Sequence, residues 1–335
     1  MNSKRFNIVI PSLTLSLELI NCLIKFNNQK HKNFFVTIVL DYKNKNKIPK
    51  LNYKLNTLIV GKRTMSFKRN HAAKKFKSDF IAFIDSDAYA NKEWLSRGLK
   101  ILKNDKKKII GGPSIPFPNQ NFSEMMCHYA KRSYFVTGYL NFRKYKAKSR
   151  FCDWLESCNL MLDRNLFLKN GGMNEKIYVG EDKEFIERFK KKDSSIKVFY
   201  NPQLYIYHKE RPFLKFLLQR MTFGSDIVNI INFNNKLQSF QPLLPLTTVV
   251  LLISIIFLDI NYQFKFNILI SIISIIQMLI LFNLFTYLKN LKKIIPVLII
   301  VNLANLSYAI GNLFDFTGIK KLFNRKIYLK SRNNK

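Results

Sequence analysis

The chain has 335 residues and a formal net charge of +35, from 56 Lys and Arg against 21 Asp and Glu. The length leaves room for more than one domain. A balance this basic points to a polyanionic partner, such as nucleic acid, an anionic membrane or a phosphorylated substrate. Lys, Asn and Ile are abundant along the whole chain, which indicates that composition bias supplies most of the charge.

The four cysteines have no Cys-x-x-Cys spacing, which excludes that class of metal site, and we expect reduced thiols without a disulfide framework.

Short apolar runs alternate with amphipathic stretches over residues 1–209. We expect strands at Phe6–Ile10, Phe34–Leu40, Leu58–Val60, Phe80–Ile84, Cys158–Leu162 and Val198–Tyr200, and another that starts at Ile109. We expect helices at Leu13–Phe26, Ser66–Lys77, Trp94–Leu102 and Asp163–Lys169, and another that opens at Gly180. The alternation predicts an α/β fold, a mostly parallel sheet with helices on both faces. Residues 114–150 are expected to form a long connection along one side of a cleft, with a mobile loop as the alternative for 141–150.

Two carboxylates follow the apolar run Phe80–Ile84, which suits a buried strand of a parallel sheet. Ligands of open α/β sheets bind at the carboxyl ends of strands, where Asp85 and Asp87 are expected to lie. Two carboxylates there can hold a hard divalent cation and, through it, a diphosphate. The competing interpretation is an Asp-rich turn, because Asp and Ser are common turn formers.

A second acidic group opens the amphipathic helix after Gly180. Its apolar side carries Phe185, Ile186 and Phe189. A carboxylate in the first turn is favoured by the helix dipole, so capping alone can explain Asp182.

The order of these motifs resembles the family 2 glycosyltransferases, which have the GT-A fold, over residues 6–224. The resemblance rests on Ile8–Pro11, Arg69–Asn70, Phe83–Asp87, Gly111–Gly112, Asn159–Arg164, Gly171–Glu175 and Gly180–Asp182, with Arg188, Pro202 and His208. The chain departs from the pattern after the second strand, where Asp41-Tyr-Lys-Asn replaces the usual Asp-Asp-Gly-Ser, and this leaves the nucleobase open. It also has Ser12-Leu-Thr after the first strand instead of an Asn-rich turn, so donor contacts there do not transfer.

The resemblance implies an inverting, metal-dependent enzyme with a nucleotide-diphospho-sugar donor. The residues implied to border the donor are Pro11, Asp41, Arg69, Asn70 and Asp85. Mg²⁺ or Mn²⁺ is implied at Asp87 and Asp85, with His208 as a candidate third ligand, although a lone His at a strand end is also compatible with a structural role. Asp182 is implied as the general base that takes the proton from the acceptor hydroxyl, with Glu181 as the fallback.

The last third of the chain is dominated by Leu, Ile, Val and Phe. Leu243–Ile260 and Phe264–Phe285 are each close to the ~20 apolar residues that span a bilayer, and the short link between them predicts a hairpin. Ile294–Phe314 is long enough but carries three Asn residues, so both a third span and an interfacial helix stay open. Lys289, Lys292 and Lys293 indicate that the side after the hairpin is cytoplasmic. The segment Arg211–Lys236 is expected to form a basic amphipathic helix on the membrane surface.

We therefore predict a catalytic domain over 1–209, a juxtamembrane amphipathic helix over 210–241, a membrane region of two to three hydrophobic helices over 242–318 and a basic tail over 319–335. The predicted protein is a multi-pass enzyme of the inner (cytoplasmic) membrane with a cytoplasmic catalytic domain. It is expected to move a sugar onto a glycan or lipid-linked acceptor in cell-surface polysaccharide synthesis, with the lipid bilayer as a partner and no nucleic acid.

Two alternatives to this function stay open. The first is a polyprenyl-phosphate glycosyltransferase. The second is a non-catalytic, membrane-tethered protein that binds nucleotides or nucleic acid. Asp85, Asp87, Glu181 and Asp182 argue against the second, because a nucleic-acid surface avoids such clusters of negative charge.

Overall fold

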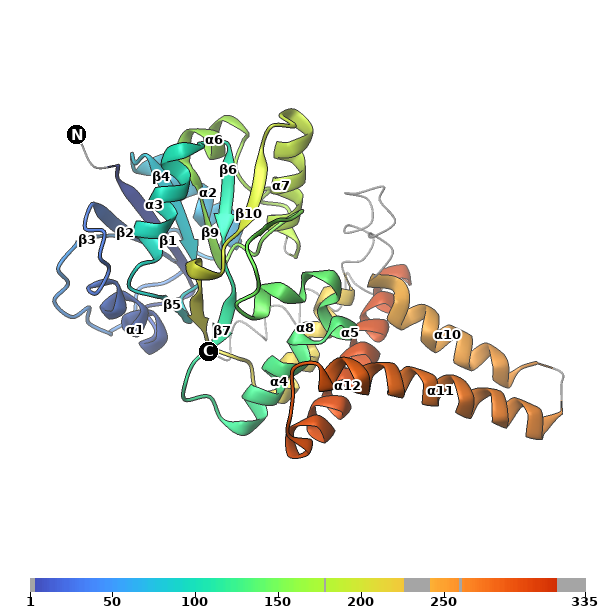
Figure 1. The fold of residues 1–335 in the computed structure, drawn as a ribbon. Coiled ribbons are helices and arrows are strands. Elements are labelled where there is room, and N and C mark those ends of the chain that lie inside the picture. Colours follow the sequence, from blue (N-terminus) through green and yellow to red (C-terminus); the bar gives the residue numbers. More distant parts are fainter. Residues whose placement is uncertain (1–3, 178, 226–241, 259–260, 318–335) are drawn as a thin grey trace. The chain divides into compact units, whose positions relative to one another are not determined.

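The computed structural model describes residues 4–177, 179–225, 242–258 and 261–317, which fall into two compact units (Figure 1). The first unit contains residues up to Pro118 and Phe142–Lys209, and the second contains Asn119–Asn141 and the residues from Glu210 onward. Residues 119–141, which the sequence placed in the catalytic domain, are thus part of the second unit. The predicted basic tail and the second half of the predicted juxtamembrane helix, residues 226–241, lie outside the described residues.

An eight-stranded sheet with the order β3-β2-β1-β4-β9-β6-β10-β8 forms the centre of the first unit. Its strands are β1 (Phe6–Ser12), β2 (Phe34–Leu40), β3 (Lys54–Ile59), β4 (Phe80–Ile84), β6 (Lys108–Gly111), β8 (Arg150–Phe151), β9 (Asn159–Asp163) and β10 (Lys197–Tyr200). Strands β8 and β9 run antiparallel to their neighbours, and the other pairs are parallel. The predicted α/β fold with a mostly parallel sheet is confirmed.

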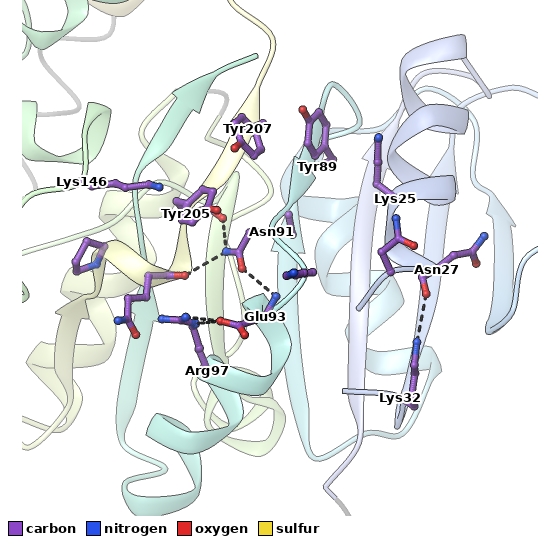
Figure 2. Close-up of a pocket in the computed structure, with 15 residues that line it drawn as sticks. Lys25, Asn27, Lys32, Tyr89, Asn91, Glu93, Arg97, Lys146, Tyr205 and Tyr207 are labelled. Atoms are coloured by element: carbon purple, nitrogen blue, oxygen red, sulfur yellow. Dashed lines mark hydrogen bonds and ion pairs between the residues drawn. The ribbon is translucent and has the colours of Figure 1, made fainter. Parts of the chain in front are cut away.

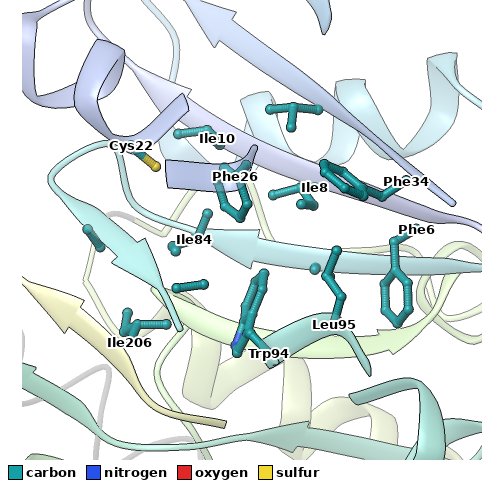
Figure 3. Packing of buried hydrophobic residues seen from close by; sticks show 14 of the residues in the cluster. Phe6, Ile8, Ile10, Cys22, Phe26, Phe34, Ile84, Trp94, Leu95 and Ile206 are labelled. Atoms are coloured by element: carbon teal, nitrogen blue, oxygen red, sulfur yellow. The ribbon is translucent and has the colours of Figure 1, made fainter. Parts of the chain in front are cut away.

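Helices cover both faces of this sheet. They are α1 (Leu17–Phe26), α2 (Met65–Lys75), α3 (Trp94–Asn104), α6 (Arg164–Lys169) and α7 (Glu181–Lys192). Figure 3 shows Phe26 of α1 and Trp94 of α3 packed against Ile8 and Ile84 on one face. On the other face, Phe83 contacts the ring of Phe167 of α6 at a centroid distance of 5.3 Å. Because side chains alternate along a strand, β4 contributes to both cores.

Strand β1 is longer than predicted. Pro11 was expected to end it, but pairing with β2 continues to Ser12 opposite Leu40. Proline lacks an N–H and is tolerated where a strand has no partner on one side. The pairing of β1 with β4 ends at Val9, so no strand on that side requires a backbone hydrogen bond from Pro11.

A small sheet of β5 (Ala88–Ala90), β11 (Ile206–His208) and β7 (Ser114–Pro116) follows the carboxyl end of β4. Ala88 and Ile206 are buried in the same core as α1 and α3. The intervening residues Tyr89 and Tyr207 are paired in the register and stack with their ring centroids 4.9 Å apart. The same register sets His208 opposite Ala88, the residue after Asp87.

The described part of the second unit is helical. Its helices are α4 (Phe122–Arg132), α5 (Tyr134–Thr137), the 3-10 helix η1 (Gly138–Lys144, which ends in the first unit), α8 (Phe213–Gly224), α10 (Leu244–Ile256), α11 (Tyr262–Phe285) and α12 (Leu291–Phe316). Residues 122–144, expected as a connection, are therefore mostly helical. Helix α12 supplies much of the apolar core, in which Val297 and Ala304 pack with Met126 of α4 and Phe216 of α8.

Two helices, α11 and α12, are long and apolar enough to cross a membrane. The first predicted span is shorter than expected, because α10 has 13 residues. At 1.5 Å per residue such a helix is about 20 Å long, short of the ~30 Å hydrocarbon core.

We expect Gly311→Ala to lower the melting temperature of the detergent-purified chain. A methyl group on Gly311 of α12 would lie 2.1 Å from the carbonyl oxygen of Met221 and 2.9 Å from the amide nitrogen of Ser225. Both are backbone atoms that cannot rotate away. Replacing Gly by Ala inside a helix otherwise gains about 1 kcal/mol, so a fall in melting temperature isolates the steric cost. A rise would contradict this close crossing of α8 and α12.

Candidate active site

Asp85, Asp87 and His208 meet where β4 and β11 end. The Nε2 atom of His208 lies 3.7 Å from Oδ2 of Asp85 and 3.6 Å from Oδ1 of Asp87. The Nδ1 atom of His208 lies 2.9 Å from the carbonyl oxygen of Lys209, so Nδ1 carries the proton and donates it there. Nε2 therefore faces the two carboxylates: when protonated it donates to them, and when neutral its lone pair is available to a metal ion, as in a metal-binding His oriented by a backbone carbonyl.

These donors fit a divalent cation, because carboxylate oxygen and imidazole nitrogen are ligands that Mn²⁺ accepts. A fourth group joins them, since one ligand atom each of Asp85, Cys158 and His208 lie within 4.8 Å of one another. Cys158 was not predicted to take part in a metal site. The signal is in the strand register: Asn159 pairs with Ile84 across β9 and β4, which brings the preceding Cys158 to the level of Asp85.

Arg69 joins this site to a second group of carboxylates. Its side chain is 3% exposed, and it lies on α2, which begins after the N-cap residue Thr64. Nη2 of Arg69 is 3.1 Å from Oδ1 of Asp85, and Nη1 is 3.1 Å from Oε1 of Glu181. Burial opposes the ionisation of Asp85, but His208 and the charge of Arg69 outweigh it and hold the pKa of Asp85 below its ordinary value.

Glu181 and Asp182 form the first turn of α7, directly after Gly180 with its left-handed φ of +80°. The backbone N–H of Ser157 donates to Oδ2 of Asp182 at 3.1 Å, and that of Lys183 donates to Oδ1 at 2.8 Å. Burial, together with the charge of Asp182, raises the pKa of Glu181 to about 7. Burial also raises the pKa of Asp182, although the hydrogen bond from Ser157 favours the carboxylate. A raised carboxyl pKa is typical of general bases.

Glu156 adds a carboxylate that the sequence did not single out. Its two oxygens each accept a hydrogen bond from Nζ of Lys144 at 2.8 Å, and Oε1 lies 3.7 Å from Nη2 of Arg143. The Arg143 guanidinium stacks 4.0 Å from the ring centroid of Trp154. Although burial works against ionisation, the charges of Lys144 and Arg143 lower the pKa of Glu156 to about 2. The residues next to Glu156 in the sequence do not predict these ion pairs, because both cations come from the 3-10 helix η1.

The model of glycosyl transferase family 2 matches residues 8–161 of the chain. The chain carries a family 2 glycosyltransferase domain. No curated protein matches its sequence. Among solved structures, this glycosyltransferase is similar to the mannosyltransferase PcManGT from Pyrobaculum calidifontis, with 13% identity and a TM-score of 0.58 over 94% of this chain and 88% of that one. At this identity the likeness shows the fold, and the predicted GT-A architecture is confirmed.

Two further solved structures match the glycosyltransferase with lower TM-scores. S. aureus TarS is 16% identical with a TM-score of 0.44, over 73% of this chain and 43% of that one. GalNAc-T7, solved with UDP, GalNAc and Mn²⁺, is 12% identical with a TM-score of 0.49, over 63% of this chain and 45% of that one. The chain spans less than half the length of these two proteins.

The structure does not bring all predicted site residues of the glycosyltransferase together. Asp85, Asp87, Arg69, His208 and Asp182 belong to the groups described above. Their roles stay predictions.

Asn70 is turned away from this group. Its Nδ2 donates to the carbonyl of Met173 at 2.8 Å and to Oε1 of Glu175 at 2.9 Å, and its Oδ1 accepts from the N–H of Met173. Consecutive helical residues point about 100° apart, so Arg69 and Asn70 cannot face the same site. Asn70 holds the loop after α6, and its predicted contact with the donor stays untested.

Asp41 directly follows β2, and Pro11 is the penultimate residue of β1. The Asp41 side chain is fully buried and pairs with Nζ of Lys68 at 2.6 Å. Lys68 also donates to the carbonyl oxygen of Ser12, so this ion pair ties α2 to the ends of both strands. The predicted contact of Asp41 with the base or ribose remains a prediction.

We expect Co²⁺, added to the purified glycosyltransferase, to give a thiolate-to-metal charge-transfer absorption that Cys158→Ser removes. A thiolate is a soft ligand that Co²⁺ and Zn²⁺ accept readily. Cys152→Ser is the matched control and should keep the band, because Cys152 is not in the ligand group. Absence of the band in the unaltered protein would exclude Cys158 as a ligand.

Proposed function

We propose that the chain is an inverting glycosyltransferase that uses a nucleotide-diphospho-sugar and a divalent cation. The observation that carries the proposal is the convergence of Asp85, Asp87 and His208 at the end of β4, linked through Arg69 to the start of α7. Binding at this edge is typical of open α/β sheets. The structure of PcManGT contains GDP-Man and Mn²⁺, which supports the proposed donor and metal classes through the shared fold.

In the proposed reaction, Asp182 accepts the proton of an acceptor hydroxyl as its oxygen bonds to the anomeric carbon. The bond from that carbon to the diphosphate oxygen breaks, and the nucleoside diphosphate leaves with the electron pair. A single displacement inverts the anomeric centre. A cation, Mg²⁺ or Mn²⁺, held by Asp85, Asp87 and His208 supplies charge neutralisation at the departing diphosphate when bound. Arg69 fixes Asp85 and Glu181 in position.

Release of nucleoside diphosphate by the detergent-purified chain tests the proposal. The screen covers UDP-, GDP- and dTDP-sugars, each with Mn²⁺, with Mg²⁺ and with chelator. We expect turnover of one donor that the chelator stops. Failure to bind any of these donors, with or without metal, would overturn the proposal and favour the non-catalytic alternative.

We propose that the acceptor is a glycan or lipid-linked glycan at the cytoplasmic membrane, in cell-surface polysaccharide synthesis. The membrane location is supported by the apolar helix α11. Only 11% of its most apolar stretch is buried within the chain. The corresponding stretch of α12 is 44% buried, against helices α4 and α8 that carry charged residues. We therefore propose that the α10–α11 hairpin enters the bilayer and that α12 lies at its cytoplasmic surface.

A polar pair is consistent with this packing of α12. The side-chain amides of Gln277 in α11 and Asn302 in α12 exchange two hydrogen bonds, of 3.0 and 2.9 Å. Such pairs hold helices together at a membrane. Asn302 is thereby satisfied within the unit.

We expect a C-terminal GFP fusion to fluoresce in cells, because GFP matures only on the cytoplasmic side and the proposed topology keeps the basic tail there. An alkaline phosphatase fusion at the same residue should be inactive. The opposite pair of results would mean that α12 crosses the membrane.

A further inference from the structure

A groove of about 890 Å³ lies on the first unit (Figure 2). Its walls come from the end of α1, the connection from β5 into α3, and residues 202–207 before and within β11. Figure 2 shows Tyr89, Tyr205 and Tyr207 on one side of the opening with Lys25 and Lys146 at its two flanks. None of the carboxylates of the candidate active site lines it.

The groove is strongly basic. Its lining contains five cations, namely Lys25, Lys32, Lys92, Arg97 and Lys146, and the single carboxylate of Glu93. Glu93 is already bonded to Arg97 and Lys30. Within the described residues, no carboxylate pairs with any of the four lysines. Positive charge concentrated in a concave surface attracts an anionic ligand.

Aromatic rings line the same groove in a row. Tyr207 lies between Tyr89, at a centroid distance of 4.9 Å, and Tyr205, at 5.6 Å. The ammonium of Lys25 lies 5.6 Å from the ring centroid of Tyr89, and that of Lys146 lies 3.7 Å from the ring centroid of Tyr205. Tyrosine offers an apolar face together with a hydroxyl group for hydrogen bonding. A ligand with ring-shaped units, hydroxyl groups and negative charges matches these three features.

The groove and the candidate active site share the small sheet of β5, β11 and β7. Tyr207 precedes His208 in β11, and Tyr89 is two residues after Asp87. Side chains alternate across a strand, so the tyrosines project from the face of the small sheet opposite to His208. A chain that reaches the site around the end of this sheet can therefore lie along the tyrosines.

We infer that this groove binds an anionic glycan, namely the part of the acceptor chain that lies away from the reacting hydroxyl. The inference rests on the proposed function, since it assigns the acceptor's charge class to a glycosyltransferase. A single-stranded nucleic acid would also meet lysines and aromatic rings. The glycan is favoured because the groove and the candidate active site share the small sheet of a domain whose family transfers sugars.

Affinity electrophoresis of the full chain in detergent tests the inference, with polygalacturonate as the anionic glycan, dextran as the neutral one and a single-stranded DNA oligonucleotide. The test variant is Lys25→Glu with Lys146→Glu. The control is Lys47→Glu with Lys50→Glu, which changes the net charge equally at exposed positions outside the groove. A third variant, Tyr205→Ala, keeps the charge.

We expect polygalacturonate to bind and dextran to bind weakly or not at all. The groove variant should bind polygalacturonate about tenfold more weakly or worse, since two attractive charges in a concave surface become repulsive ones. The control should change less than about twofold, because distant exposed charges are screened. Tyr205→Ala should also weaken binding. Equal losses in groove and control variants, equal binding of dextran, or a stronger groove dependence for DNA would overturn the inference.

A donor turnover assay on the same variants separates this inference from the proposed function. The groove variant should hydrolyse donor at the unaltered rate when no acceptor is present, because none of the substituted residues touches the donor-site group. If the unaltered protein turns over no donor, the proposed function fails whatever the groove binds. If donor is turned over and the groove variant binds polygalacturonate normally, only the inference fails.

Discussion

Asp87→Ala should reduce donor turnover about a thousandfold. The Asp87 side chain is 16% exposed and points its Oδ1 at Nε2 of His208. Removing it takes one carboxylate from the proposed cation site and leaves the departing diphosphate with less of its charge balanced. Loss of one preorganised electrostatic contact of this kind typically costs 10²–10³-fold in rate.

The matched control is Asp79→Ala, at the other end of the same strand. Asp79 pairs with Lys4 at 2.9 Å and accepts from the N–H of Arg5, away from the site. This change should alter the rate by no more than a small factor, because the effect of Asp87 is local to the carboxyl end of β4. Turnover of Asp87→Ala above a tenth of the unaltered rate would contradict the assignment. Isothermal titration with Mn²⁺ should show weaker binding in parallel.

The position of the proposed cation site could be predicted from a local sequence pattern. An apolar run followed by Asp85 and Asp87 predicts a buried strand with carboxylates at its end, and β4 has that form. His208 was named only through the family resemblance, because its place at the end of a Tyr-rich strand is equally compatible with a structural role.

The links between distant residues could not be predicted in this way. Arg69 contacts Glu181, which is 112 positions further along the chain. Cys158 reaches Asp85 through the antiparallel register of β9 against β4, and an antiparallel strand in a mostly parallel sheet has no local signature. The helix α4 was missed although it has local signals, namely the capping box of Asn121 and Glu124 and apolar residues at helical spacing on the face that packs against α12.

Asp182→Asn should abolish transfer to an acceptor while donor binding is retained, since the amide cannot take a proton. The asparagine keeps the size of the side chain and can still accept the hydrogen bond from Ser157 through its carbonyl oxygen. Glu181→Gln should have a smaller effect, because Glu181 is bonded to Arg69 and is assigned to hold it in position. The reverse order of effects would move the general base to Glu181.

The pH dependence separates the two carboxyl groups further. A general base acts as the carboxylate, so activity is lost as the pH falls below its pKa. Burial and the adjacent charge of Asp182 raise the pKa of Glu181 to about 7, and burial raises that of Asp182 as well. The two groups interact, so the pair retains a proton up to about pH 7, and turnover should rise as the pH increases through this value. In Glu181→Gln only Asp182 is left to titrate, so the rise should move to the lower pH at which Asp182 alone ionises. An unchanged profile in Glu181→Gln would mean that a group outside this pair controls the reaction.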